Sequence, residues 1–124
     1  MAVKLNELAF EHAKQLIRAG KVVLDSRDDW SEARPSAQAE NSFIEQHGFR
    51  EYKKWYLGID TDEEEETKAR YKFPYGDFER VHRGGVLTAE ARAGQYKYLD
   101  VERAAAHLHG MLDALQVHPQ PTAP

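Results

Sequence analysis

The sequence predicts a mostly α fold: one compact domain of four to five helices with an aromatic, proline-containing loop packed across them. Apolar residues recur at helical spacing near both ends of the chain, over residues 5–17 and 101–115. Gly20 follows the first of these runs, at the position where a glycine commonly ends a helix. The length of 124 residues fits a single domain, which we assign to residues 1–115, followed by a proline-rich disordered tail over 116–124.

The segment after the first helix carries weaker signals. Residues 22–24 are apolar but too few to classify, and residues 25–35 are predicted to form a polar loop around Trp30. Ser36 is a suitable N-cap for a second helix. We expect this helix to end at Gly48.

Two alternatives exist for the middle of the chain. We favour a short helix over residues 49–57 followed by an irregular loop. The alternative is a short β-hairpin at 55–73, with strands at 55–59 and 70–73 on either side of the acidic run 60–66. The acidic run carries like charges and is therefore expected to be solvated.

An aromatic segment, residues 71–78, follows the acidic run. Pro74 and Gly76 exclude a regular helix in this segment. Its five apolar or aromatic side chains need contacts, so we expect the segment to lie across the helices rather than in solvent.

Two further helices complete the predicted domain. Asp77 is the expected N-cap of a helix beginning at Phe78, and Asp100 is the expected N-cap of the last helix. Gly84 and Gly85 leave two possibilities open: they stay inside the first of these helices and allow close packing, or they break it.

Composition limits the cellular setting. The chain has no cysteine, a net charge of −4, and an N-terminal segment interrupted by charges every few residues, and no stretch is apolar enough to span a membrane. We therefore expect a cytoplasmic protein without membrane association. Residues 1–67 hold 9 Lys and Arg against 15 Asp and Glu, whereas residues 68–124 hold 8 against 6. An acidic half and a slightly basic half either steer a charged partner or attract each other within one domain, and we favour mutual attraction.

Patterns typical of metal or nucleophilic chemistry are missing. His107 and His109 are two residues apart and point to different sides of a helix, so they cannot chelate one ion. The acidic run lacks the glycine of a calcium loop, and no serine stands in a nucleophile elbow. We assign no metal, cofactor or catalytic residue. His12 is interpreted as a core histidine bonded to a carbonyl or an aspartate, with a buried base as the alternative.

Cations and aromatic residues interleave over residues 68–98, a pattern typical of single-strand nucleic-acid binding, although no recognised nucleic-acid motif is present. The His82-Arg83-Gly84-Gly85 sequence forms an anion site if the glycines start a helix, and a packing contact if they lie inside one; we favour packing. The candidate ligand-binding residues are Tyr71, Lys72, Tyr75, His82, Arg83, Gly84 and Arg92.

Three functions remain as hypotheses. The first is a non-enzymatic binding or interaction module whose partner is a protein, contacted through residues 71–78 with Arg83 and Arg92. The second is binding of an anionic ligand or nucleic acid through the 71–92 surface. The third is a small enzyme that uses His82, Arg83 or His12 with a carboxylate such as Asp77.

Longer motifs run from residue 55 to residue 115: W-Y-L-G-I-D, T-K-A-R-Y-K-F-P-Y-G-D-F, V-H-R-G-G-V-L-T-A-E-A-R-A and D-V-E-R-A-A-A-H-L. They resemble a small helical module of bacterial and phage-derived proteins, some associated with prohead proteases of capsid maturation. The whole chain also resembles small stand-alone bacterial proteins. The resemblance implies a docking or interaction unit without a protease domain, and it assigns no reaction. Its signature positions are Tyr71, Lys72, Pro74, Arg83, Gly84 and His107.

Overall fold

The computed structural model describes residues 2–117 and confirms a mostly α domain with a small sheet. Its α-helices are α1 (Glu7–Arg18), α2 (Trp30–Ala33), α3 (Ala37–Tyr52), α4 (Arg83–Gln95) and α5 (Leu99–Val117). Its strands are β1 (Val3–Leu5), β2 (Val22–Val23), β3 (Tyr56–Asp60), β4 (Tyr71–Pro74) and β5 (Val81–His82). Three single 3₁₀ turns complete the elements: η1 (Arg27–Asp29), η2 (Lys53–Trp55) and η3 (Lys68–Arg70). None of the described helices is both long and apolar enough to cross a bilayer.

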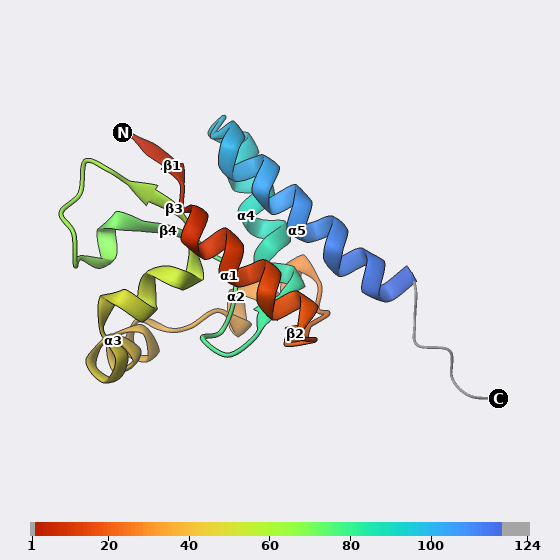
Figure 1. Ribbon diagram of the computed structural model, residues 1–124, viewed down its shortest axis with the longest axis horizontal. Helices are drawn as coiled ribbons and strands as arrows, with labels where there is room; N and C mark the ends of the chain where they lie inside the picture. Colours follow the sequence, from red (N-terminus) through yellow and green to blue (C-terminus); the bar gives the residue numbers. More distant parts are fainter. Residues whose placement is uncertain (1, 118–124) are drawn as a thin grey trace.

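The strands form two sheets. In the larger sheet the order is β1-β3-β4 and both pairings are antiparallel, whereas β2 and β5 form a separate parallel pair. Helices α4 and α5 form a helical hairpin, α1 packs beside α5, and the larger sheet contacts all three helices (Figure 1). The core lies between these layers, and its largest fully buried side chains are Tyr52, Leu57, Tyr75, Val81, Val86, Val101, Leu108 and Leu112.

The first helix is confirmed, and its start carries a contact that the sequence did not reveal. The side chain of Asn6 caps α1 by accepting from the N–H of Ala9, while its Nδ2 donates to the carbonyls of Lys53 (2.8 Å) and Tyr56 (2.9 Å). Asn6 is buried, so these bonds are shielded from water. The cap of α1 therefore also holds the start of β3. At the other end, Gly20 adopts a positive φ of 75°, as expected of a residue that ends a helix.

The preferred helix-and-loop reading of residues 49–57 is wrong beyond Tyr52, and the alternative hairpin is confirmed. A 3₁₀ turn follows Tyr52, and β3 then pairs with β4, with Gly58 opposite Lys72. Residues 56–60 form a strand rather than a helix because β1 pairs with the other edge of β3, so that β3 has partner strands on both sides. Three consecutive residues at the start of β3 are buried, as expected for a central strand covered on both faces.

The helix expected to begin at Phe78 begins instead at Arg83. The Asp77 carboxylate accepts from the N–H groups of Glu79 (3.0 Å) and Arg80 (2.7 Å), which closes a turn rather than capping a helix. The chain then forms β5, in which Val81 is fully buried and pairs with β2. Pairing and burial of this short strand thus override the local helix signal.

Gly84 and Gly85 consequently lie in the first turn of α4, neither inside a longer helix nor at a break within one. The predicted polar loop at 25–35 contains two short helical turns, and its Trp30 is only 3% exposed. The helix from Ser36 is confirmed, with a non-helical kink at Gly48. The predicted disordered tail at 116–124 is wrong at its first two residues, which continue α5 to Val117, and residues 118–124 lie outside the described part of the chain.

The aromatic segment packs as expected. Tyr75 is fully buried, and its ring stacks on Trp55 with the centroids 5.5 Å apart. The ring of Phe78 stacks on Phe43 of α3 at 4.3 Å. These contacts hold the segment that leads from β4 to α4 against the body of the protein, so that β4 and α4 keep a defined separation.

Candidate functional site

A cleft of about 530 Å³ opens between β4, α4 and the segment that joins α2 to α3. This volume is in the range of small-molecule sites. Two kinds of side chain dominate its lining. The charged ones are Arg34, Glu40, Lys68, Lys72 and Arg92, and the aromatic ones are Trp30, Tyr52, Tyr56, Tyr71, Phe73, Tyr96 and Tyr98.

Secondary structure positions the two long walls of this cleft. Thr88 and Arg92 of α4 and its C-cap residue Tyr96 are spaced four residues apart, so they lie on one side of the helix and span about 12 Å. The opposite wall is β4, all four residues of which line the cleft. The result is an elongated site with a helix on one side and a strand on the other.

One end of the cleft is polar. The Tyr56 hydroxyl donates to Glu40 at 2.5 Å, and Lys68 Nζ lies 3.0 Å from the same carboxylate. Burial raises the pKa of both Tyr56 and Tyr52, so their hydroxyls stay protonated and act as donors. Glu40 therefore accepts from neighbours within the protein, and its charge is matched by Lys68.

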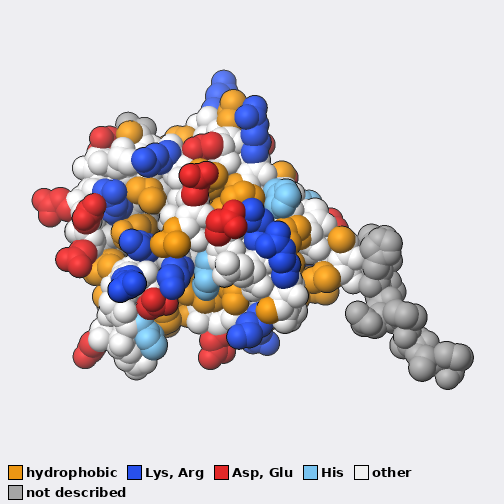
Figure 2. Space-filling view, viewed as in Figure 1, with side chains coloured by type: hydrophobic (Ala, Val, Ile, Leu, Met, Phe, Trp, Pro, Cys, Tyr) orange, Lys and Arg blue, Asp and Glu red, His pale blue; other side chains and the backbone are white. Residues whose placement is uncertain are grey.

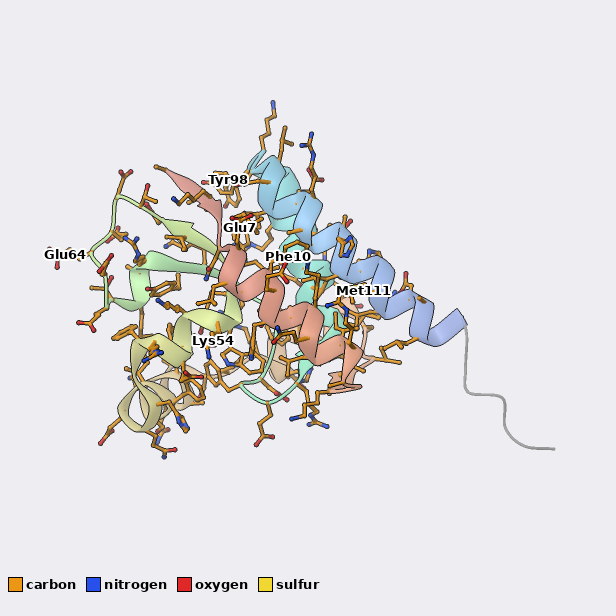
Figure 3. All side chains as sticks on the ribbon, in the orientation of Figure 1. Glu7, Phe10, Lys54, Glu64, Tyr98 and Met111 are labelled. Carbon is orange, nitrogen blue, oxygen red and sulfur yellow. The ribbon has the colours of Figure 1, made fainter. Side chains whose placement is uncertain are left out.

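The other end is aromatic. The rings of Tyr96 and Tyr98 stack with centroids 5.9 Å apart, and the Phe73 ring meets Tyr98 edge-on at 6.0 Å. Figure 3 shows Tyr98 at the turn between α4 and α5, beside β1. In that turn Lys97 has a φ of 62°, and the N–H groups of Lys97 and Tyr98 donate to the carbonyls of Gly94 and Ala93. This turn ends α4 and sets the two tyrosine rings side by side.

Positive charge is concentrated in the cleft. Four cationic side chains face one carboxylate there, although the whole chain has a net charge of −4. Within residues 2–117, Lys68 pairs with Glu40, whereas no ion pair joins Arg34, Lys72 or Arg92 to a carboxylate. In contrast, cationic and acidic side chains are interspersed on the face shown in Figure 2, which carries α1 and α5.

A second cluster surrounds the start of α4. His82 Nδ1 lies 2.8 Å from Asp25 and Nε2 lies 2.8 Å from Asp77, and the residue is only 6% exposed. The N–H of Gly84 donates to the other Asp25 oxygen at 2.7 Å. The anion position that the sequence suggested at this helix end is thus filled by the protein's own Asp25. Both nitrogens of His82 are engaged, so the ring faces no open site.

Arg83 and His109 connect α4 to α5 at the surface. Arg83 Nε lies 3.0 Å from Asp113, and His109 lies 2.8 Å from Glu90 and 2.9 Å from Asp113. All of these side chains are at least a fifth exposed, so the bridges contribute little to stability. Arg83 therefore belongs to a surface bridge and not to the cleft.

Tyr75 and His12 form a separate, part-buried contact. The Tyr75 hydroxyl donates to the Lys54 carbonyl at 2.7 Å and lies 3.0 Å from His12 Nδ1. Because the hydroxyl hydrogen is already used, His12 Nδ1 is the donor in that contact. Burial lowers the pKa of His12, so its neutral form is favoured. This arrangement fits a core histidine, whose partner is a tyrosine hydroxyl.

The structure thus divides the seven predicted site residues into three places. Tyr71, Lys72 and Arg92 line the cleft; Tyr75 lies in the core; and His82, Arg83 and Gly84 belong to the clusters at α4. The site prediction did not include the remaining cleft residues. Of these, Lys68, Phe73, Tyr96 and Tyr98 belong to the interleaved pattern of cations and aromatics, but Arg34, Glu40, Tyr52 and Tyr56 carry no local signal.

We expect acidic pH to reduce the contribution of Asp77 to the stability of the protein. Burial acts to raise the pKa of Asp77, but hydrogen bonds from His82 and from the N–H groups of Arg80 and Glu79 outweigh it and lower that pKa. Its contribution to stability is therefore present above the ordinary aspartate pKa and is lost as the pH falls below it. Between about pH 5 and pH 2, we expect the free energy of unfolding of Asp77→Asn, measured by urea denaturation, to fall less steeply with decreasing pH than that of the parent protein. The exposed Asp28→Asn is the control, and a parent-like slope in Asp77→Asn would contradict this account.

Comparison with protein-family models, curated proteins and solved structures finds no match to the chain. The resemblance of residues 55–115 to the phage-derived module therefore stays a prediction. Among the described residues, no group of three or more His, Asp or Glu side chains could hold a metal ion. The two carboxylates at His82 illustrate why, because they contact opposite nitrogens of one ring and do not converge.

Proposed function

We propose that this protein is a non-enzymatic binding module and that it binds a small anionic ligand in the cleft between β4 and α4. The observation that carries the proposal is the excess of cations there: four basic side chains against a single carboxylate. Three of them, Arg34, Lys72 and Arg92, have no acidic partner among residues 2–117. A concave, low-dielectric wall strengthens the attraction of such groups for an anion.

The location of these groups supports a small ligand over a protein partner. Tyr75, the centre of the segment first considered as a docking surface, is fully buried, and Phe78 is packed on α3. Lys72 of β4 and Arg92 of α4 instead both line a cleft of ligand size. Guanidinium and ammonium groups on opposite walls suit a phosphate or carboxylate held between them.

The test is a titration of the protein with inorganic pyrophosphate at low and at high NaCl. The dissociation constant is measured from the changes in amide chemical shifts in NMR spectra. We expect binding to weaken with salt and to be at least about tenfold weaker in the double variant Lys72→Gln/Arg92→Gln, which loses two charge-assisted contacts. Arg103→Gln is the matched control, because Arg103 is exposed on α5 and does not line the cleft. Equal weakening in the control, or no binding by the parent protein, would refute the proposal.

A further inference from the structure

One ring at the aromatic end of the cleft, that of Tyr96, is exposed to solvent. Tyr96 is 56% exposed although its ring stacks on Tyr98 and borders the cleft. Burial of an aromatic ring is strongly favourable, so an open ring in a concave site is a surface that a flat apolar group would cover. The basic side chains alone would suffice to bind a simple anion. The exposed ring therefore offers the ligand a contact that a simple anion would not use.

Backbone strain at the same end supports a specific arrangement of side chains. Phe73 has a φ of 64° and Lys97 a φ of 62°, a region that bulky residues rarely adopt. In a regular strand, neighbouring side chains point to opposite faces. With Phe73 in this conformation, Lys72 and Phe73 both line the cleft. The strained turn at Lys97 likewise sets the rings of Tyr96 and Tyr98 together.

Each wall therefore places a cation beside a ring. Arg92 of α4 and the C-cap residue Tyr96 lie one turn apart, about 6 Å along the helix axis. On β4, Lys72 is adjacent to Phe73. A ligand that uses both walls fully has an anionic group and a flat ring separated by a short linker.

We propose that the anion bound in the cleft is a nucleoside phosphate, with its phosphate between Lys72 and Arg92 and its base against Tyr96 and Phe73. This inference rests on the proposed function and specifies its ligand. Bases of every kind have a flat face that stacks on aromatic side chains, and phosphates pair with Lys and Arg. An aliphatic phosphate would leave the rings uncovered, and a neutral aromatic compound would leave the two cations without a partner.

The test compares matched ligands by isothermal titration calorimetry: the four ribonucleoside 5′-monophosphates, the corresponding nucleosides, ribose 5-phosphate and inorganic phosphate. We expect at least one nucleotide to bind at least about fivefold more tightly than ribose 5-phosphate, because a stacked base adds to the phosphate contacts. In Tyr96→Leu this advantage should disappear. The exposed Leu115→Ala on α5 is the control and should retain it, and thermal melting should show that both variants are folded.

The outcomes separate this inference from the proposed function. If ribose 5-phosphate binds as tightly as every nucleotide, or if Tyr96→Leu keeps the nucleotide preference, the inference is overturned while anion binding stands. If none of the phosphate compounds and no pyrophosphate binds, both proposals fail. The nucleoside phosphate is either a free nucleotide or part of a single-stranded nucleic acid, and a titration with a single-stranded hexanucleotide distinguishes the two. A hexanucleotide that binds more than about tenfold more tightly than the monomer indicates a nucleic-acid strand, whereas similar affinities indicate a free nucleotide.

Discussion

In Gly84→Ala we expect the free energy of unfolding to fall by about 3 kcal/mol or more. A methyl group on Gly84 would overlap the carbonyl oxygen of Ser26 and lie 3.3 Å from Asp25 Oδ1. The Ser26 carbonyl cannot easily move away, because it accepts from the N–H of Asp29 and so closes the turn η1. The clash would separate α4 from the segment that holds Asp25, and urea denaturation monitored by circular dichroism measures the loss.

A second glycine provides a matched control, at which alanine is expected to raise the free energy of unfolding instead of lowering it. Gly110 lies inside α5, and a methyl group there would meet no atom within 4 Å. Alanine at this position should stabilise the protein by about 0.5–1 kcal/mol, because alanine restricts the unfolded chain and favours helix. Comparable losses in Gly84→Ala and Gly110→Ala would show that close approach at Ser26 is not the cause.

The second large effect is expected at Asp25. We expect Asp25→Ala to lower the free energy of unfolding by about 3 kcal/mol, because it leaves two partners buried without an acceptor. The Asp25 side chain is 11% exposed, and its two oxygens accept from His82 Nδ1 and from the N–H of Gly84. Chemical denaturation near neutral pH measures this difference.

Asp113 is the control for Asp25, because it also pairs with a basic residue of the same region. Its side chain is 41% exposed, and it pairs with Arg83 and His109 at the surface. Asp113→Ala should therefore cost less than about 1 kcal/mol. A double-mutant cycle between Asp25→Ala and His82→Ala then isolates their coupling, and strictly additive losses would contradict a direct bond between them.

The parts of the fold that could be predicted are those whose signal is local. The signals for α1 and α5, for the cap at Ser36 and for the interruption of helical geometry at Gly48, which was predicted as a helix end, all lie within a few residues of the features they determine. The hairpin of β3 and β4 was only an alternative, since its stability depends on β1. Three residues, Val3–Leu5, carry no pattern that reveals a partner strand more than fifty positions away.

The same limit applies to the candidate site. Lys72 and Arg92 belong to a stretch in which cations and aromatic residues interleave, so both were among the predicted residues. Arg34 and Glu40 come from a distant segment that the packing of α2 and α3 brings to the cleft. At Gly84 the helix end was a reasonable candidate for anion binding, but Asp25, which fills it, precedes it by 59 residues.

The placement of β1 also has a consequence for how the protein is made. The strand emerges from the ribosome before its partner β3, which lies some fifty residues later, and the N–H of Leu5 donates to the side chain of Asp100. At about 5–20 residues per second, β1 waits several seconds before either contact can form. The bond between Leu5 and Asp100 therefore forms only after the start of α5 has been synthesised, 95 residues after Leu5.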